Sequence, residues 1–360
     1  MTTFHYRFTH FADPALRYSG RIDPEPFSNH SATSTRLVFP YTNIAFRFTG
    51  TSLTVRLVNH SAYYNSYIGA MIDGNEYKIP IPRDDESLDL PIANRLEPRL
   101  HDAIVFKRQD GCHYIDFEGL LTDPESQILP PSRPRPLRRI EVYGDSVSAG
   151  EVSEAVDYAG KPDPEHQGEY SNSWYSYTAI TARNLNAELH DIAQGGVSLL
   201  NGIGWFNGPA YQGMESIYDK IDYNPSLGPT KPWNFKCFNP QVVIVALGQN
   251  DSHPFDFMKA DYYSEQSQHW RTCYADFLRA LRSLHPHALI ICATTILEHD
   301  ASWDKAIGDA VVSVYDSKIV HFLYSKNGKG TPGHVRIPEA YAMAHELTSF
   351  IRTFGEDLWK

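Results

Sequence analysis

A proline-rich segment divides the chain into two parts whose apolar residues follow different periodicities. Residues 129–136 read LPPSRPRP and contain four prolines. Proline fixes its own backbone torsion and lacks an N–H donor, so this segment predicts a stiff, extended linker rather than a helix or a central strand. A chain of 360 residues has room for two domains. We predict a first domain over residues 1–128, a linker over 129–137 and a second domain over 138–360.

The first part has the pattern of short antiparallel strands. Apolar and polar side chains alternate along it, and turn residues such as Asp73-Gly74 and Asp110-Gly111 separate the alternating runs. We expect hairpins that pair residues 44–48 with 53–57, 70–72 with 77–79, and 104–106 with 114–117. Because no convincing helical pattern interrupts these strands, we predict an antiparallel β-sandwich of jelly-roll type.

After the linker, short apolar runs alternate with stretches of helical periodicity. Such runs are typical of strands that are buried on both faces of a sheet. The strands are expected at residues 140–143, 190–193, 242–247, 289–293 and 319–323, and helices at 270–284, 303–314 and from Pro338 onward. This alternation predicts a three-layer α/β domain, whose ligand site lies at the carboxyl ends of the strands.

The triplet Gly144-Asp145-Ser146 follows the first of these strands. A serine at this position is lifted out of the sheet, and backbone N–H groups at the start of the next helix point toward the atom that its hydroxyl attacks. Taken alone, such a triplet more often marks an ordinary turn in which Asp or Ser caps a helix.

Three further residues occupy positions that a serine hydrolase requires. Gly196 follows the strand at 190–193 and could bring an N–H close to a reacting oxygen, although it could also serve only a turn. Asn250 follows the strand at 242–247 and could donate to an oxyanion, or it could cap a helix. His334 precedes the last helix and could accept the serine proton, or it could be a surface histidine.

In this order the GDS, Gly, GxND and His segments resemble the SGNH (GDS-type) hydrolases, which are esterases and lipases built on a flavodoxin-like sheet. The segment Arg47–Leu53, Asp73-Gly74 and the preceding β domain are similar to carbohydrate esterase family 2, whose members remove O-acetyl groups from plant polysaccharides such as xylan and mannan. The resemblance implies Ser146 as nucleophile and His334 as base, with an oxyanion hole formed by Ser146, Gly196 and Asn250.

Two departures from the family pattern affect the histidine. The position three residues before His334, where an Asp usually orients the imidazole, holds Thr331. We therefore expect a Ser–His dyad in which a backbone carbonyl holds the ring, with Glu298, Asp300 and Asp304 as the carboxylates that could compensate. The residues after the histidine are Val335-Arg336, where Pro-Ser is common.

Three aromatic residues are candidates for substrate binding. Trp205 lies in a glycine-rich loop after Gly196, where stacking on a sugar and plain packing are both open. His253 follows Asn250, and Trp303 lies on the apolar face of the helix expected at 303–314.

The formal net charge of -11 argues against nucleic acid or an anionic membrane as partner. The N-terminus has no signal-peptide pattern and no apolar run is long enough to span a bilayer, so we expect a cytoplasmic protein unless a leader was removed. No metal or cofactor motif is present, and we expect none to be needed; the sequence leaves the oligomeric state open.

The expected activity is carbohydrate O-deacetylation. A lipase or thioesterase of the same superfamily and a non-catalytic carbohydrate-binding protein are the alternatives.

Overall fold

The structure, a computed structural model, describes residues 6–29 and 31–360. The chain forms two compact units, and each unit contains segments from distant parts of the sequence. The contiguous division predicted above differs in this respect, because residues 167–169 and 221–231 lie with the first unit. Unit 1 comprises Met1–Arg135, Gln167–Glu169 and Ile221–Lys231, and unit 2 comprises Pro136–His166, Tyr170–Lys220 and Pro232–Lys360.

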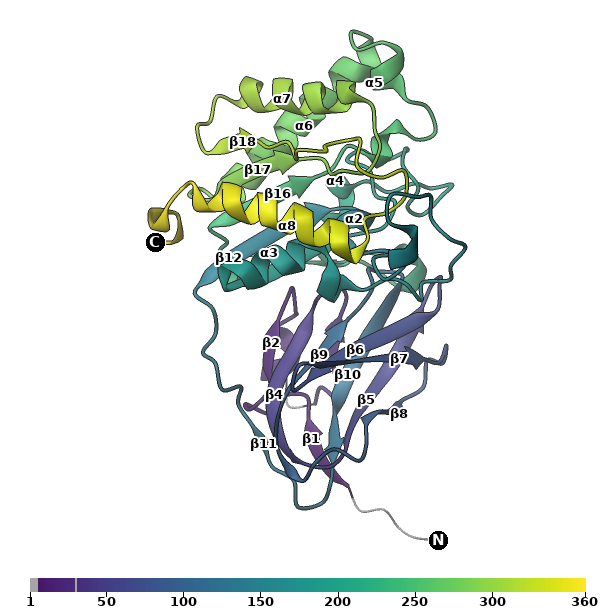
Figure 1. The fold of residues 1–360 in the computed structure, drawn as a ribbon, viewed down its shortest axis with the longest axis vertical. Coiled ribbons are helices and arrows are strands. Elements are labelled where there is room, and N and C mark those ends of the chain that lie inside the picture. The colour runs from purple at the N-terminus through teal and green to yellow at the C-terminus, as the bar shows by residue number, and fades with distance from the viewer. Residues whose placement is uncertain (1–5, 30) are drawn as a thin grey trace. The chain divides into compact units, whose positions relative to one another are not determined.

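Unit 1 contains two antiparallel sheets and the short helix α1 (Glu25–Ser28) (Figure 1). Apolar side chains that alternate along the strands form one buried core, which includes Phe46, Leu57 and Phe117. The first sheet consists of β1 (Arg7–His10), β3 (Thr35–Leu37), β5 (Leu53–Ser61), β8 (Leu88–Ala93) and β10 (His113–Thr122). The second consists of β2 (Arg17–Ser19), β4 (Asn43–Gly50), β6 (Ser66–Ile72), β7 (Asn75–Ile81), β9 (Arg99–Lys107) and β11 (Ile128–Leu129).

Only one of the three expected hairpins is present. Strands β6 and β7 pair around Asp73-Gly74, with Ile72 opposite Asn75. The other two predictions are wrong, because β4 and β5 lie in different sheets, as do β9 and β10. Two alternating strands joined by a turn can pair as a hairpin in one sheet or lie in the two facing sheets. Both arrangements bury the apolar side chains in the same core, so the alternating pattern does not distinguish them.

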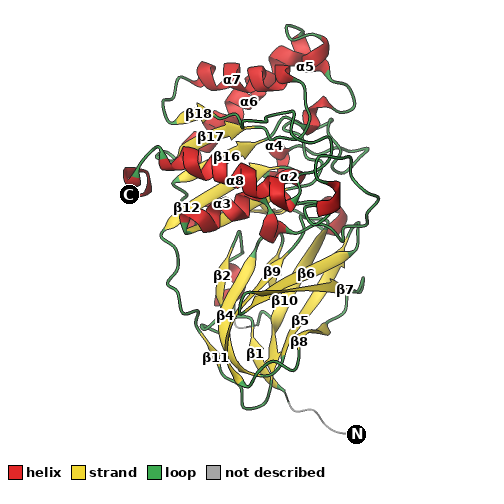
Figure 2. Cartoon of the chain, in the orientation of Figure 1, coloured by secondary structure: helices red, strands yellow, loops and turns green. Residues whose placement is uncertain are grey.

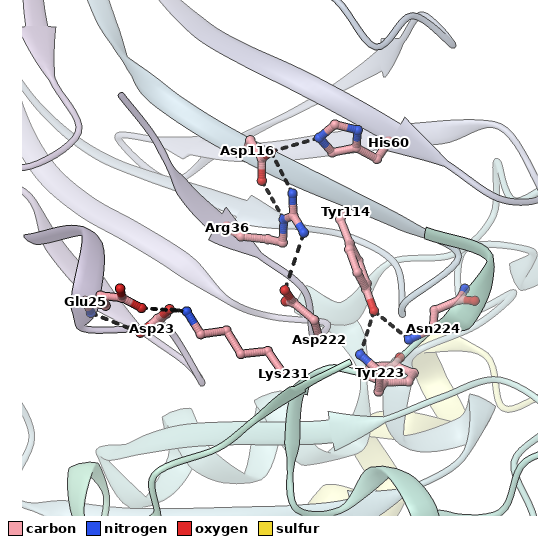
Figure 3. Close-up of polar contacts among 10 residues, drawn as sticks. All are labelled: Asp23, Glu25, Arg36, His60, Tyr114, Asp116, Asp222, Tyr223, Asn224 and Lys231. Atoms are coloured by element: carbon pink, nitrogen blue, oxygen red, sulfur yellow. Dashed lines mark hydrogen bonds and ion pairs between the residues drawn. The ribbon is translucent and has the colours of Figure 1, made fainter. Parts of the chain in front are cut away.

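Residues 221–231 are held to unit 1 by polar contacts (Figure 3). The Arg36 guanidinium donates to both oxygens of Asp116, at 2.6 and 2.9 Å, and lies 3.4 Å from the Asp222 carboxylate. The Tyr114 hydroxyl accepts the backbone N–H groups of Tyr223 and Asn224, at 2.9 and 2.7 Å. At the other end of the segment, the Lys231 ammonium pairs with the carboxylates of Asp23 and Glu25.

Unit 2 is built on a five-stranded parallel sheet in the order β13-β12-β16-β17-β18. This is the flavodoxin-like order 2-1-3-4-5, which reverses direction beside the first strand and places a ligand crevice at that point. All the strands predicted for this part of the chain are present. They are β12 (Arg138–Gly144), β13 (Ala187–Ala193), β16 (Val242–Ala246), β17 (Leu289–Ala293) and β18 (Ile319–His321).

Helices form two packed pairs against this sheet (Figure 2). Helix α3 (Tyr177–Leu185) packs on α8 (Ile337–Arg352), and α6 (Glu265–Leu284) packs on α7 (Ala301–Val314). The pair α3 and α8 lies on one face of the sheet and the pair α6 and α7 on the other (Figure 2). This is the arrangement that right-handed crossovers produce when the chain winds from β12 first in one direction along the sheet and then in the other. No helix among the described residues combines the length and the apolar character that a membrane span requires.

The remaining elements of the chain are short. They are α2 (Ser146–Ala149), α4 (Met214–Ile217), α5 (Phe257–Ala260), the paired strands β14 (Lys220–Asp222) and β15 (Lys231–Pro232), and the 3-10 turns Val156–Tyr158, Ser173–Tyr175, Pro225–Leu227, Phe235–Cys237, Asn250–Ser252 and Glu356–Trp359.

Candidate active site

Ser146 is the first residue of α2, directly after the carboxyl end of β12. The side chain of Asp145 caps this helix by accepting the Val147 N–H at 3.0 Å. Gly144 cannot carry a side chain, since a Cβ there would lie 2.2 Å from the Ser148 hydroxyl oxygen. The tight strand-to-helix turn therefore fixes the direction of the Ser146 side chain, which is the geometry expected of a nucleophile at a sheet edge.

Gly196 and Asn250 lie at the ends of the two strands that flank β12. Gly196 has a φ of +74°, and a Cβ on it would lie 2.8 Å from the Trp205 Cβ, so the position requires glycine. The Asn250 amide nitrogen donates to the Val197 carbonyl at 3.0 Å and lies 3.4 Å from an Asp145 oxygen. Asn250 thus holds the segments that follow β12, β13 and β16 together.

Within the described residues, the N–H groups of Ser146 and Gly196 donate to no other protein group. The Asn250 amide has two N–H groups, of which one donates to the Val197 carbonyl at 3.0 Å and the other makes a long bond of 3.4 Å to an Asp145 oxygen, which an entering oxygen atom could replace. These three residues are therefore suited to donate hydrogen bonds to an oxygen atom that enters the site.

Two buried carboxylates support this edge of the sheet. Asp145 also accepts a hydrogen bond from the Gln249 amide at 2.7 Å; burial raises the pKa of Asp145, although the bonds from Gln249 and Val147 oppose the rise. Asp251 accepts the Leu199 N–H at 2.9 Å and the Trp270 indole N–H at 2.7 Å. Burial raises the pKa of Asp251 to about 6. Both groups fix loops that carry the candidate donors.

His334 is held by a carboxylate, which corrects the expectation of a backbone carbonyl. The Asp163 Oδ2 atom lies 2.5 Å from His334 Nδ1, and Asp163 Oδ1 accepts the His334 backbone N–H at 2.9 Å. Asp163 comes from the loop between α2 and α3, and in the sequence it is far from Thr331, which occupies the usual position of the acid. Sequence reasoning missed it because a single carboxylate in a loop has no pattern of its own.

The carboxylates expected to compensate have other partners or lie elsewhere. Asp300 caps α7 by accepting the Ser302 N–H at 3.0 Å. Asp304 accepts hydrogen bonds from Thr294 at 2.6 Å and lies 3.1 Å from His299 Nε2. Glu298 is exposed.

Arg336, which departs from the family pattern, has a clear place beside this pair. Its buried guanidinium donates to Asp163 Oδ1 at 2.6 Å and to the His334 carbonyl at 2.5 Å. Burial raises the pKa of Asp163, but the hydrogen bonds from His334 and Arg336 outweigh it and lower that pKa well below 3.8. Gly333 permits this approach, since a Cβ there would lie 2.6 Å from Asp163 Oδ1.

The other ring nitrogen of His334 faces a second carboxylate. His334 Nε2 lies 3.9 Å from Glu151 Oε2, and the Glu151 N–H donates to the Ser146 carbonyl at 2.9 Å. Glu151 thus connects His334 to the helix that carries Ser146. Burial lowers the pKa of His334, but the bond to Asp163 and the charges of Glu151 and Asp163 outweigh it and raise the pKa above 6.5.

The three candidate substrate-binding residues differ in exposure. Trp205 is 61% exposed and stacks on His253, with ring centroids 3.3 Å apart. The Trp205 N–H also donates to the Gly196 carbonyl at 2.8 Å, so this aromatic pair adjoins the candidate oxyanion donors. Trp303 is fully buried against Phe257 and Trp270. Its assignment to substrate binding is wrong, because a ring in the core cannot contact a substrate.

Comparison with known proteins identifies relatives of the chain. Residues 18–131 match the family model described as carbohydrate esterase 2 N-terminal. The chain resembles the family 2 carbohydrate esterases. A solved family 2 carbohydrate esterase from Clostridium thermocellum, in complex with cellohexaose, superposes with a TM-score of 0.76 at 24% identity, over 94% of this chain and 98% of that one. At this identity the likeness establishes the fold.

Two curated proteins extend the resemblance across both units. The cellulase/esterase CelE of Acetivibrio thermocellus is 28% identical over 352 residues, which are 94% of this chain and 39% of CelE. An acetylxylan esterase / glucomannan deacetylase of Cellvibrio japonicus is 26% identical over 351 residues, or 95% of this chain and 89% of that protein. The chain therefore spans about two fifths of CelE but most of the second relative.

Proposed function

We propose that this chain is a serine esterase that removes O-acetyl groups from carbohydrate. The observation that carries the proposal is the His334 imidazole, which is held by Asp163 on one side and connected to the Ser146 helix through Glu151 on the other. An oriented histidine near a serine at a strand-to-helix turn is the arrangement that activates a hydroxyl for acyl transfer. The names of the two curated relatives support an ester substrate.

In this mechanism His334 acts as base and then as acid. Its Nδ1–H donates to Asp163, which leaves Nε2 free of a proton and able to accept the Ser146 hydroxyl proton as Oγ attacks the acetyl carbonyl. The developing oxyanion accepts hydrogen bonds from the Ser146 and Gly196 N–H groups and from the Asn250 amide. His334 then protonates the departing sugar oxygen. A water molecule, deprotonated by the same nitrogen, attacks the acetyl-enzyme and releases acetate.

The stacked pair of Trp205, which is exposed, and His253, which is half-buried, supports a sugar as the alcohol part of the substrate. An aromatic face packs against the C–H-rich face of a pyranose ring while the sugar hydroxyls stay in water, and this pair lies beside Gly196. The carbohydrate complex of the Clostridium thermocellum esterase supports the same class of ligand. We place acetylated xylan, mannan and their oligosaccharides first among candidate substrates.

We also assign the two sheets of unit 1 to a jelly roll.

Acetate release from a defined panel tests the proposal. The panel contains acetylated xylan, acetylated glucomannan, p-nitrophenyl acetate and p-nitrophenyl octanoate, each with the wild-type chain and with Ser146→Ala. We expect hydrolysis of the acetates by the wild type and a loss of at least ~10³ in kcat for the variant. A preference for the octanoate by kcat/KM would instead favour a lipase. Binding of the polysaccharides without any turnover would favour a carbohydrate-binding protein.

A further inference from the structure

Glu151 occupies a position that the backbone fixes with respect to Ser146. Helix α2 is capped by Gly150, which has a φ of +75° and could not carry a Cβ, because that atom would lie 2.6 Å from the Asn172 carbonyl oxygen. The next residue, Glu151, donates its N–H to the carbonyl of Ser146 at 2.9 Å. This tight turn holds the Cα and Cβ atoms of Glu151 at a fixed position relative to Ser146.

The Glu151 carboxylate lies on the reacting side of the histidine. Its Oε2 atom is 3.9 Å from His334 Nε2, whereas Asp163 holds Nδ1 on the opposite side of the ring. The two carboxylates therefore have different neighbours. Asp163 orients the ring from behind, through the nitrogen that takes no part in proton transfer. Glu151 faces the nitrogen through which protons pass in the proposed mechanism.

Proximity to Nε2 places Glu151 beside the leaving group. When His334 protonates the departing oxygen, that oxygen must lie within about 3 Å of Nε2. A carboxylate oxygen 3.9 Å from the same nitrogen is then within reach of the sugar atoms next to the departing oxygen. The Glu151 side chain is 13% exposed, so it is not sealed in the core.

Resting on the esterase function proposed above, we infer that Glu151 is a substrate-binding residue that selects the alcohol part of the ester. Its carboxylate accepts a hydrogen bond from the hydroxyl on the carbon next to the acetylated position of the sugar. A carboxylate accepts through two oxygens, so it can contact this hydroxyl in addition to its contacts within the protein. Through its charge, it also disfavours alcohols that carry a carboxylate, such as uronic acids.

A different role for Glu151 would leave a different signature. If the carboxylate acted only on His334, its removal would change proton transfer for every substrate alike. It would shift the pH dependence of kcat/KM by the same amount whether or not the leaving group is a sugar. A contact with the sugar hydroxyl instead changes the ratio between substrates that have this hydroxyl and substrates that lack it.

The experiment compares three acetate esters at one pH and over a pH series. The esters are p-nitrophenyl acetate, a mono-acetylated methyl glucoside with a free neighbouring hydroxyl, and the matching mono-acetylated methyl glucuronoside. They are assayed with the wild type, Glu151→Ala, Glu151→Gln and Glu165→Gln. The last variant removes the charge of an exposed glutamate that lies in the same connecting segment, and it serves as the matched control.

We expect Glu151→Ala to lower the ratio of kcat/KM for the glucoside to that for p-nitrophenyl acetate by about tenfold or more, the size of a lost hydrogen bond to a charged group. Glu151→Gln should keep part of this preference, since its amide oxygen still accepts. It should also reduce the discrimination against the glucuronoside by about tenfold. Glu165→Gln should leave both ratios unchanged. Should the alanine variant fail to fold, the glutamine variant and the charged sugar still decide the question.

The outcomes separate this inference from the function on which it rests. Unchanged ratios, together with an equal shift of the pH profile for all three esters, would overturn the role of Glu151 in sugar selection and leave the esterase intact. A wild-type chain that hydrolyses none of the three acetates would overturn the proposed function itself.

Discussion

The carboxylate of Asp163 lies 2.5 Å from Nδ1 of His334, although 171 positions separate the two residues in the chain. The same carboxylate accepts the backbone N–H of His334 and the guanidinium of Arg336. Three donors thus converge on one side chain, which keeps it ionised and fixed. The histidine is therefore oriented by a negative charge, and the proposed site contains a Ser–His–Asp set in place of the dyad expected from the sequence.

Asp163→Asn should reduce kcat on p-nitrophenyl acetate by up to ~10⁴. The amide NH₂ group can donate to Nδ1, which favours the imidazole tautomer with its proton on Nε2, and this tautomer cannot accept the serine proton. Steady-state kinetics of the purified variant check this. Glu298→Gln, which alters an exposed carboxylate in the loop after β17, is the control and should retain activity within about tenfold. Equal activity of Asp163→Asn and the wild type would show that the contact has no catalytic role.

The pH dependence of kcat/KM should show an acid limb whose midpoint lies above 6.5, the ordinary pKa of histidine. Burial lowers the pKa of His334, but Asp163 and Glu151 outweigh it and raise the pKa above 6.5. The base must be neutral to accept the serine proton, so activity is present above this pKa and is lost as the pH falls through it. Initial rates of p-nitrophenyl acetate hydrolysis across the neutral and acid range measure the midpoint. A midpoint below 6.5 would contradict the prediction.

Asn250→Ala should lower kcat by ~10²–10³ with little change in KM, because the amide interacts mainly with charge that appears in the transition state. Asn250 also bonds to Val197, so circular dichroism and a thermal melt of the variant must accompany the kinetics. A variant that stays folded and changes only KM would show that Asn250 binds the ground-state substrate.

Trp205→Ala should raise KM for acetylated oligosaccharides by roughly tenfold, since stacking on an aromatic face contributes about 1 kcal/mol or more. The effect on p-nitrophenyl acetate should be smaller, because this ester has no sugar to cover the ring. Tyr263→Ala removes another exposed aromatic side chain of unit 2, 75% exposed, and is the control. A Trp205 variant with unchanged kinetics on oligosaccharides would remove this ring from the substrate site.

Asp116→Asn should destabilise unit 1 by about 2 kcal/mol at neutral pH, because the pKa of this carboxyl is lowered from 3.8 to about 2 in the folded chain. Burial raises the pKa of Asp116, but the bonds from Arg36 and His60 outweigh it and lower the pKa to about 2. Because this value is below that of the unfolded chain, the stabilisation is present above pH 3.8 and is lost as the pH falls toward 2.

Urea unfolding of Asp116→Asn and the wild type at neutral pH and at successively lower pH tests the sign of this effect. Asp89→Asn is the matched control. It breaks an Arg56–Asp89 pair of the same 2.6 Å length, whose side chains are 35% and 46% exposed, and it should cost less than about 1 kcal/mol. A difference for Asp116→Asn that grows on acidification would contradict the assignment.

The parallel sheet could be predicted because its strands are buried on both faces. Runs such as Val242–Ala246 are apolar at every position, which makes them easy to recognise in the sequence. The residues that follow these runs, including Ser146 and Asn250, lie at the edge of the sheet where ligands bind. The helix periodicity was equally informative for α6 and α7. Here local sequence and fold agree, since a buried strand and an amphipathic helix are each specified by their own residues.

Long-range contacts could not be predicted, because they depend on residues that have no periodic signal. Asp163 stands in a loop, and its role follows only from the approach of Gly333 and Arg336. Trp303 has the position of a helix-face residue, and the same pattern fits a ring that lines a site and one that packs in the core. The connection after β4 was also predicted wrongly, because the packing of both sheets together determines which sheet the next strand joins.

Residues 221–231 affect how this protein can be divided. A cut in the proline-rich segment would release a fragment without Asp222, Tyr223 and Lys231. Arg36, Tyr114 and Asp23 would then lose the contacts that these three residues supply. The two units are therefore not interchangeable modules that can be joined or exchanged at a single junction. A chimera with another β-sandwich would have to transfer this later segment along with the first 135 residues, and natural recombination at the linker meets the same requirement.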